Sequence, residues 1–169
     1  NSTKSFTGSV VEYHENGQLW FSTNYKKGLR DGFFEEYHDN GQLKERGNNK
    51  NGSSDGLFES FYENGYLKKK GNYKNGYKEG LWEEYSGWDQ TIIYTGVYKD
   101  GKKEGLHKRF HYVGNQLEYE INYINGKTEG LVETYDKEGG LISRENFKNG
   151  LLDGLREEFF YGQISERTN

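Results

Sequence analysis

A glycine motif that recurs at almost constant spacing is the strongest constraint on how this chain folds. The pattern Gly-x-x-Asp/Glu-Gly appears six times, and successive copies begin 24 or 25 residues apart. A period of this length indicates a repeat protein, in which each copy is one supersecondary unit that buries its apolar residues against its neighbours. We therefore interpret the chain as about six and a half copies of one short unit. The copies begin at Gly28, Gly52, Gly76, Gly101, Gly126 and Gly150.

A second turn signal lies between successive glycine motifs. It reads Asn16-Gly17, Asn40-Gly41 and Asn64-Gly65, and later Glu138-Gly139. Asn-Gly between two alternating segments predicts a β-hairpin with a type I′ turn, because that turn needs positive φ at both central residues. Each unit is thus predicted to be a strand, a tight turn, a second strand and a glycine turn. The fourth and fifth units carry one extra residue each, which we place inside the hairpin turn, where it leaves the strand register unchanged.

Large apolar residues follow each turn at even spacing, which predicts that they share one face of a strand. In the third unit these are Leu57 and Phe61 on the first strand, and Leu67 and Tyr73 on the second; Asn49 is the exception to the second ring in its unit. The predicted fold is all-β, an elongated single-layer antiparallel meander of stacked hairpins, with residues 1–169 forming one repeat domain. We place the units at about 8–31, 32–55, 56–79, 80–104, 105–129 and 130–153, with a partial unit at 154–169.

The composition fits a thin structure and narrows the range of partners. Only 31% of the residues are apolar and 30% are charged, yet 17% are aromatic, so we expect a core made mainly of rings. A net charge of −4 argues against nucleic acid, since phosphate binding needs a basic surface. The absence of Cys excludes disulfides and thiolate metal sites and slightly favours the cytoplasm. The first residue is not Met, so we expect the native start to lie upstream and leave export open.

The repeated segments resemble a known family. The combination Asp/Glu-Gly-Leu-x-Glu-x-Tyr, then Asn-Gly-x-Leu, then Tyr-Lys-Asn-Gly, as in residues 55–76, resembles the MORN repeat and looks closest to its bacterial variant form. The resemblance covers roughly residues 8–164. It implies an extended, twisted sheet that serves as an interaction module, as in protein scaffolds, adaptors at membranes and bacterial proteins labelled antitoxin-like. It brings no catalytic residue set with it.

The acidic residues of the glycine motif form a regular row for which we compare two interpretations. A row of carboxylates along one edge could bind cations, but equivalent residues in successive units should lie ~10 Å apart, too far to share one calcium ion. Carboxylates that accept backbone N–H groups of the turns explain the same pattern. We expect turn chemistry. The residues concerned are Asp31, Asp55, Glu79, Glu104, Glu129 and Asp153.

The remaining glutamates and histidines do not form a catalytic or metal-binding pattern. Neighbours such as Glu83 and Glu84 point to opposite faces of a strand and cannot act together as acid and base. The glutamates on the Leu/Tyr face are expected either to bind Tyr hydroxyls across the sheet or to lie on an open, partly hydrated face. His14, His38 and His111 recur at one position and are expected at solvated hairpin ends. With no phosphate-binding Gly-rich loop either, the sequence predicts no enzyme, no metal and no cofactor.

A stripe of aromatic residues next to the repeat leucines is the best candidate for a partner-binding site. Phe34, Phe58 and Trp82 point away from the Leu/Tyr face and lie in consecutive units. The rings either pack against one another or form an exposed patch, and exposed aromatic patches usually mark contact sites. We predict a contact site across this face. Four further aromatics are expected nearby, namely Trp20, Tyr62, Tyr66 and Trp88.

Three functions are compared on this basis. The leading hypothesis is a non-catalytic scaffold that binds another protein through the aromatic face, as a monomer or an end-to-end homo-oligomer. The alternative is a membrane-surface or phospholipid-binding adaptor that uses the basic cluster of residues 68–70 with Lys74 and Lys78. An enzyme ranks last, because no nucleophile and base are paired in the sequence.

Overall fold

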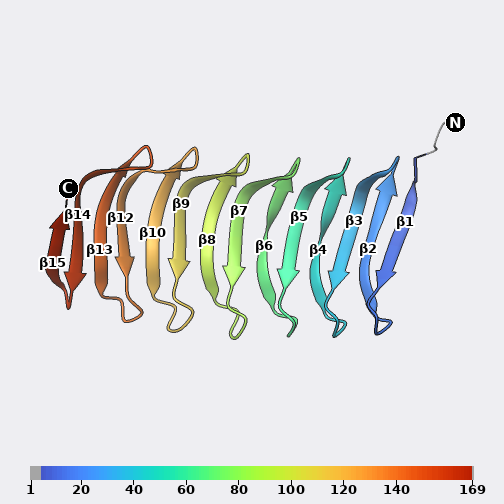
Figure 1. Cartoon of the computed structure of the whole chain (residues 1–169), viewed down its shortest axis with the longest axis horizontal. Helices are drawn as coiled ribbons and strands as arrows, with labels where there is room; N and C mark the ends of the chain where they lie inside the picture. Colours follow the sequence, from blue (N-terminus) through green and yellow to red (C-terminus); the bar gives the residue numbers. More distant parts are fainter. Residues whose placement is uncertain (1–4, 169) are drawn as a thin grey trace. The chain divides into compact units, whose positions relative to one another are not determined.

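The computed structural model describes residues 5–168, and these residues form fifteen strands and no helix (Figure 1). The chain divides into two compact units, each of which contains several of the repeats described above. The first contains residues 5–79 together with 87–90, and the second contains residues 80–86 together with 91–168. In each unit, strands that follow one another in sequence pair antiparallel in an open sheet. The predicted all-β meander of hairpins is therefore confirmed.

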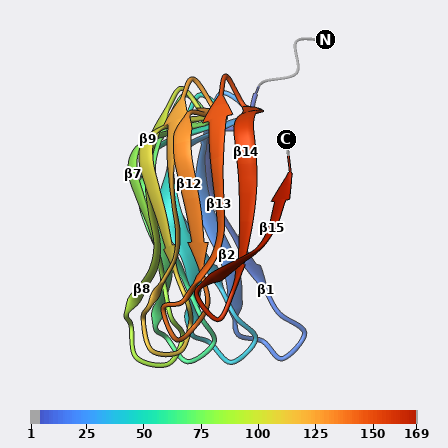
Figure 2. The same ribbon diagram turned by 90° about the vertical axis from the view of Figure 1, so that its left-hand side faces the viewer.

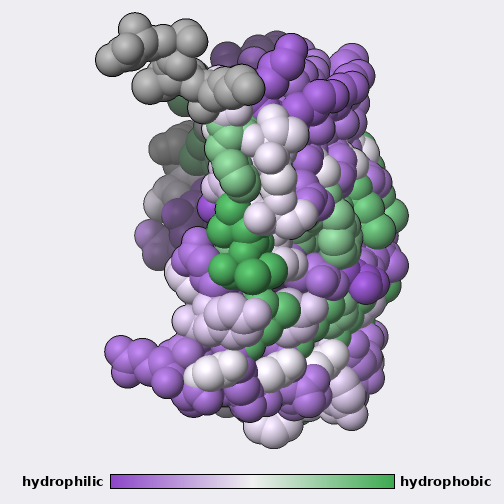
Figure 3. All heavy atoms as spheres, turned by 90° about the vertical axis from the view of Figure 1, so that its right-hand side faces the viewer, coloured by the Kyte–Doolittle hydropathy of each residue, from purple (hydrophilic) through white to green (hydrophobic). Residues whose placement is uncertain are grey.

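The first unit contains three hairpins. Each strand pairs with the next one along the chain, so the sheet order is the sequence order. Figure 3 looks onto the edge formed by the first strand and shows a band of hydrophobic residues along it, with hydrophilic residues to its left and a mixture of hydrophobic and hydrophilic residues to its right. The strands are β1 (Gly8–Tyr13), β2 (Leu19–Lys26), β3 (Leu29–Tyr37), β4 (Leu43–Lys50), β5 (Ser53–Phe61) and β6 (Leu67–Lys74).

The second unit repeats the same pairing. Its order follows the chain except that β10 pairs with both β11 and β12. These two short strands together take the place of the single strand found in the other repeats. Figure 2 shows β12 to β15 next to one another at the C-terminal end of this unit. The strands are β7 (Tyr77–Tyr85), which begins in the first unit, β8 (Ile92–Lys99), β9 (Lys102–Phe110), β10 (Leu117–Ile124), β11 (Lys127–Thr128), β12 (Gly130–Tyr135), β13 (Leu141–Lys148), β14 (Leu151–Phe160) and β15 (Gln163–Thr168).

The structure has two kinds of turn, and those at Asn-Gly differ from the sequence-based prediction. Both central residues have positive φ at the glycine turns, for example Asn51 at 50° and Gly52 at 85°, as a type I′ turn requires. At the Asn-Gly turns only the glycine does, as at Gly17 with a φ of 84°. There the His14 N–H donates to the Gln18 carbonyl at 2.8 Å, which closes a three-residue loop. The predicted type I′ geometry of the Asn-Gly turns is thus wrong, because a type I turn followed by a left-handed glycine spans this loop.

A β-bulge at the start of the second strand of each hairpin changes which residues share a face. In the β5–β6 pair, Phe61 lies opposite Leu67 but Ser60 lies opposite Lys69, so Lys68 is an extra residue. Beyond the bulge, Gly71 lies opposite Phe58, and Tyr73 therefore falls on the Phe58 face. The prediction that Leu67 and Tyr73 share a face is wrong, because the bulge shifts the alternation by one residue.

The core of each unit is a layer of aromatic rings on the face of the sheet that carries Phe58 and Tyr73 in the first unit and Trp82 and Tyr98 in the second. We call this face the ring face and its side chains the ring layer. The ring of Phe58 contacts that of Tyr73 edge-on with centroids 5.6 Å apart, and in the second unit Trp82 and Tyr98 do so at 6.4 Å. Glycine on the neighbouring strand makes room for the rings. Gly47 lies opposite Phe34, and a Cβ at Gly47 would lie 2.9 Å from the Phe34 ring. Alternation of ring and glycine across strands lets a single layer bury its aromatic side chains.

Side chains at both ends of the strands link successive hairpins. At the Asn-Gly ends, His38 Nε2 donates to the Phe61 carbonyl at 3.2 Å and Asn40 Nδ2 donates to the Glu63 carbonyl at 2.9 Å. At the other ends, the Asp31 carboxylate accepts the N–H of Asn51, 20 residues later, at 3.1 Å. Asp55, Glu104 and Glu129 accept the equivalent N–H groups. For these four residues the turn chemistry expected from the sequence is confirmed.

The glutamates of the first strands bind tyrosine, but along the strand and not across the sheet. The Tyr37 hydroxyl donates to Glu35 at 3.0 Å, and the Tyr135 hydroxyl donates to Glu133 at 2.8 Å. The two residues are two positions apart and therefore lie on the same face of one strand. Glu59, which has Phe61 at that position, instead pairs with Arg46 at 2.7 Å.

Candidate functional site

The three aromatic residues predicted to bind a partner are buried. Phe34 is 8% exposed, Phe58 is 9% exposed and Trp82 is 1% exposed. The expectation that their face is open to solvent is wrong, because glycines on neighbouring strands allow the rings to lie flat within the ring layer. Of the two interpretations compared from the sequence, mutual packing describes these three residues.

The other four predicted residues are accessible to different degrees. Trp88 is 87% exposed, Trp20 and Tyr66 are also exposed, and Tyr62 is half-buried. The structure brings Tyr62 and Trp88 together at a single hollow at the hairpin ends of the first unit. Trp20 instead lines a separate hollow on the ring face. The candidate site is therefore the hollow that contains Tyr62 and Trp88.

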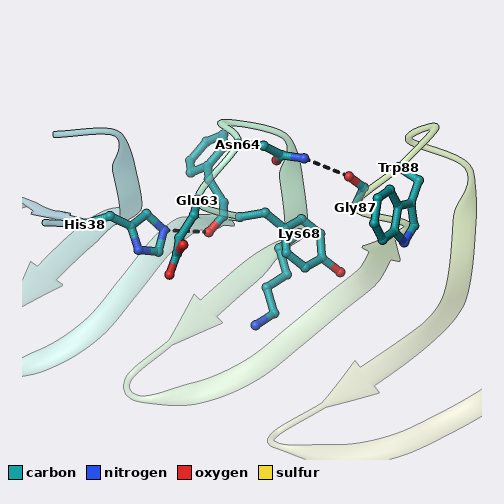
Figure 4. Close-up of a pocket in the computed structure, with 8 residues that line it drawn as sticks. His38, Glu63, Asn64, Lys68, Gly87 and Trp88 are labelled. Atoms are coloured by element: carbon teal, nitrogen blue, oxygen red, sulfur yellow. Dashed lines mark hydrogen bonds between the residues drawn. The ribbon is translucent and has the colours of Figure 1, made fainter. Parts of the chain in front are cut away.

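This hairpin-end hollow has a volume of about 490 Å³, within the range of ligand sites. In Figure 4, His38 and Trp88 lie at its two ends and Lys68 lies between them. The dashed lines there mark the bonds from His38 to the Phe61 carbonyl and from Asn64 to the Gly87 carbonyl. The residues that line the hollow are His38, Phe61, Tyr62, Glu63, Asn64, Lys68, Gly87 and Trp88.

The loop of residues 87–90, which carries Trp88, contains the one extra residue that lengthens the fourth repeat. Asn64 Nδ2 donates to the Gly87 carbonyl at 2.8 Å. Gln90 reaches a left-handed φ of 61°, and its side chain binds both backbone groups of Leu67, accepting at 3.0 Å and donating at 3.2 Å. These hydrogen bonds fix the loop, and the indole projects from a firmly held backbone.

A lysine ammonium lies over an aromatic ring within this hollow. Lys68 is the bulge residue of β6, and its Nζ lies 5.4 Å from the centre of the Tyr62 ring, within the range of a cation–π contact. Glu63 contributes a carboxylate to the same lining. Such a surface can hold an apolar or aromatic group between Tyr62 and Trp88 and bind polar groups at its rim.

Sequence reasoning singled out Tyr62 and Trp88 as candidate contact residues but not the polar members of the hollow. His38 was expected at a solvated hairpin end, and Lys68 was assigned to a basic cluster. The missing signal is the bulge, which turns Lys68 toward Tyr62 and does not show in hydrophobic periodicity. The recurrence of His and Asn at adjacent turns is the signal that could have placed His38 and Asn64 together.

The arrangement suits non-covalent binding. Within residues 5–168, no group of three or more His, Asp or Glu side chains is placed to hold a metal ion. The buried, hydrogen-bonded pair of His107 and Tyr94 lies in the ring layer of the second unit. His107 is fully buried there and cannot touch a substrate. No helix long and apolar enough to cross a membrane occurs in the part of the chain that the structure describes.

Comparison with protein families decides the identity of the repeat. The model of the MORN repeat variant matches residues 6–27, 30–51, 54–75 and 128–149, which together make up just over half of the chain. Each match covers one hairpin, from the first strand of a pair to the end of the second. The chain belongs to the MORN repeat family. A comparison with curated proteins gives no significant match.

Membership of this family has two consequences for the hairpin-end hollow. MORN repeats are commonly modules that bind proteins or membranes, and the family is generally non-catalytic. The hairpins with inserted turn residues, β7–β8 and β9–β10, lie outside the four matched stretches. Trp88 thus belongs to a part of this MORN protein that departs from the repeat, and nothing in the repeat pattern requires an indole there.

Proposed function

We propose that this MORN repeat protein is a non-catalytic interaction module that binds a partner protein at the hairpin-end hollow. The observation that carries the proposal is the 87% exposure of Trp88 on a loop whose backbone is fixed by Asn64 and Gln90. Burial of a large exposed ring in a partner's pocket supplies binding free energy. Because the loop is already ordered, little conformational entropy is lost on binding.

A protein partner agrees better with the charges than a lipid headgroup does. The lysines at positions 68–70 do not form one basic patch, since Lys69 lies opposite Ser60 on the ring face and Lys70 lies opposite Glu59 on the other face. Lys69 Nζ is 5.4 Å from the centre of the Phe58 ring. Lysines on opposite faces cannot reach the same membrane surface together. The resemblance to antitoxin-like bacterial members is also in keeping with a protein partner.

Photo-crosslinking from the hollow tests the proposal. A photoreactive phenylalanine analogue at position 88 should give one dominant crosslinked protein in an extract of the source cells. The double variant Tyr62→Ser/Trp88→Ser should lose capture of that protein by roughly 100-fold or more, as expected when hot-spot rings are removed. Circular dichroism should stay that of the wild type, because Trp88 contributes little to the buried ring layer.

A matched control comes from the other end of the chain. Tyr161 is 91% exposed and lies outside the hollow, so Tyr161→Ser removes an equally accessible ring. This variant should capture the protein as well as the wild type does. The proposal fails if the double variant retains capture, or if anionic vesicles compete with the crosslinked protein for position 88.

A further inference from the structure

A second hollow lies on the ring face of the first unit, apart from the hairpin-end hollow. Its volume is about 300 Å³, at the lower end of the range for small-ligand sites. Its exposed wall is mainly polar, and aromatic rings, including those of Phe34, Phe58 and Tyr73, form the apolar part. Carboxylates stand on the same face, so the hollow combines apolar walls with negative charge.

The ring-face hollow exists because one repeat lacks a ring. Asn49 occupies the position that Tyr25 and Tyr73 fill in the neighbouring hairpins, and that Phe147 fills later in the chain. It pairs with Gly32 on one side and with Ser54 on the other, neither of which carries a large side chain. A small polar residue among small neighbours leaves the space that a ring would otherwise occupy.

The amide of Asn49 is the second unusual feature of this hollow. The residue is only 8% exposed and lines the hollow, yet its side chain forms no hydrogen bond with any residue in the described range 5–168. An amide that lines a hollow and has no protein partner is available to a group that enters the hollow. A ligand that carries a hydrogen-bond donor or acceptor can therefore pair with Asn49.

Carboxylates on neighbouring strands add a demand for positive charge. Glu36 on β3 lies directly opposite Glu45 on β4, and both line the hollow together with Glu12. Like charges in directly opposed positions destabilise a sheet. Lys44 pairs with Glu36 at 2.6 Å, and Lys44 and Lys69 offset only part of the repulsion at Glu45. Arg30, the one cation in the lining, stacks 4.9 Å from the centre of the Phe21 ring.

We propose that the ring-face hollow binds the ammonium group of a lysine side chain from a partner protein. The ammonium donates to the Asn49 carbonyl oxygen, its charge is attracted by the Glu12, Glu36 and Glu45 carboxylates on the same face, and the lysine methylenes lie against the aromatic part of the wall. This site uses residues other than those of the hairpin-end hollow, so the two proposals stand or fall separately.

The chemistry of the lining discriminates among other occupants. An anion would be repelled by the three carboxylates, and a neutral apolar group would leave Asn49 and Glu45 unpaired. A quaternary ammonium would suit the aromatic walls but has no N–H to donate to Asn49. A primary ammonium carries three donors on a thin apolar stem, which matches both parts of the hollow.

Titration of the full chain with Nα-acetyl-lysine methylamide tests the inference, with the Asn49 side-chain amide resonances followed by NMR. We expect saturable shifts of these resonances. The norleucine analogue, which has the stem without the ammonium, should produce none. The trimethyl-lysine analogue should bind about tenfold more weakly or worse, since it lacks the donors that a charge-assisted hydrogen bond needs.

Three variants separate binding from folding. Asn49→Phe restores the ring of the other repeats, and we expect a urea midpoint at or above that of the wild type with complete loss of lysine binding, which in this variant is read from the backbone amide resonance of Gly47. Glu45→Gln should weaken binding about tenfold. Glu59→Gln, on the opposite face and paired with Arg46, is the matched control and should bind normally. The inference is overturned if Asn49→Phe still binds, or if the norleucine analogue shifts the same resonances.

Discussion

Gly96 lies opposite His107 across the β8–β9 pair, and the imidazole fills the space that a side chain at Gly96 would need. A Cβ at Gly96 would overlap Nδ1 of the ring and would lie 2.5 Å from Cε1. The ring cannot move away, because it is fully buried and its Nε2 donates to the Val97 carbonyl at 2.8 Å. His107 thus takes the position that Phe58 and Trp82 hold in other hairpins, with a glycine on the adjacent strand in each case.

Gly96→Ala is expected to destabilise the second unit by about 2–3 kcal/mol, the upper range for overpacking, because hydrogen bonds hold the clashing ring in place. Urea unfolding followed by circular dichroism measures the change. Val97→Ala, one residue away and half-exposed, is the control and should cost less than half as much. An unchanged midpoint for Gly96→Ala would show that the ring layer can relax at this position.

Tyr94→Phe is expected to cost about 1–3 kcal/mol by leaving a buried ring nitrogen without a partner. The Val97 carbonyl can only accept, so Nε2 of His107 carries hydrogen, and the neutral ring accepts the Tyr94 hydroxyl at Nδ1, at 2.6 Å. Equilibrium unfolding gives the cost, and ¹⁵N NMR of the imidazole gives the tautomer. A wild-type Nδ1–H tautomer would contradict this arrangement.

The Tyr94 hydroxyl also predicts a change of stability in alkali. Burial, and then the hydrogen bond with Tyr98, raises the pKa of Tyr94 above its ordinary value of about 10. The unfolded chain therefore loses this proton at a lower pH than the folded chain, and stability falls as pH rises above about 10. Tyr94→Phe should show a smaller loss between pH 9 and 11 in urea midpoints. Equal slopes for the two proteins would count against the assignment.

The repeat period, the hairpins and the absence of helix from the described range 5–168 could be read from the sequence, because Gly and Asn at fixed intervals specify turns directly. The face of the sheet on which the tyrosines of the second strands lie could not be read from the sequence. A one-residue bulge at Lys68 reverses the alternation of β6, and hydrophobic period alone does not reveal an extra residue. The burial of Phe34 and Phe58 could not be predicted for the same reason. Without the bulge, the Tyr and Gly residues that surround these rings could not be placed opposite them.

The candidate site was predictable in part for a related reason. Trp88 and Tyr62 were singled out as aromatics without a repeat role, and the structure places both at one hollow. Asn49 was recognised as an exception to the ring pattern, but the space it leaves depends on Gly32 and Ser54 across the strands. Such cross-strand neighbours follow from register, which a single sequence with bulges does not specify.

Asn64→Ala is expected to loosen the loop that carries Trp88. Loss of the bond to the Gly87 carbonyl removes about 1 kcal/mol of local stability, which corresponds to roughly fivefold faster amide exchange in residues 87–90. Hydrogen exchange measured by mass spectrometry reports this directly. Asn16→Ala removes the equivalent bond two hairpins earlier, to the Asp39 carbonyl, and should leave exchange in residues 87–90 unchanged. Unaltered exchange in Asn64→Ala would mean that Gln90 holds the loop alone.

Glu45→Gln is expected to stabilise the protein at neutral pH and to lose this advantage in acid. Burial, and then the facing Glu36 carboxylate, raises the pKa of Glu45, although Lys44 and Lys69 oppose the effect. The ionised group is thus less favourable in the folded chain than in the unfolded one. The penalty is fully present above the folded pKa and disappears as pH falls to the ordinary value of about 4.3.

The quantity to measure is the difference in urea midpoint between the wild type and Glu45→Gln from pH 7.5 to 4. Use of a difference matters because other carboxylates act in the opposite sense. Tyr135 and Arg144 lower the pKa of Glu133, so its contribution is present above the ordinary pKa and is lost as pH falls through the folded one. That contribution is the same in both proteins and cancels. The midpoints should converge toward pH 4, and a constant difference would mean that Glu45 is as well solvated in the folded chain as in the unfolded one.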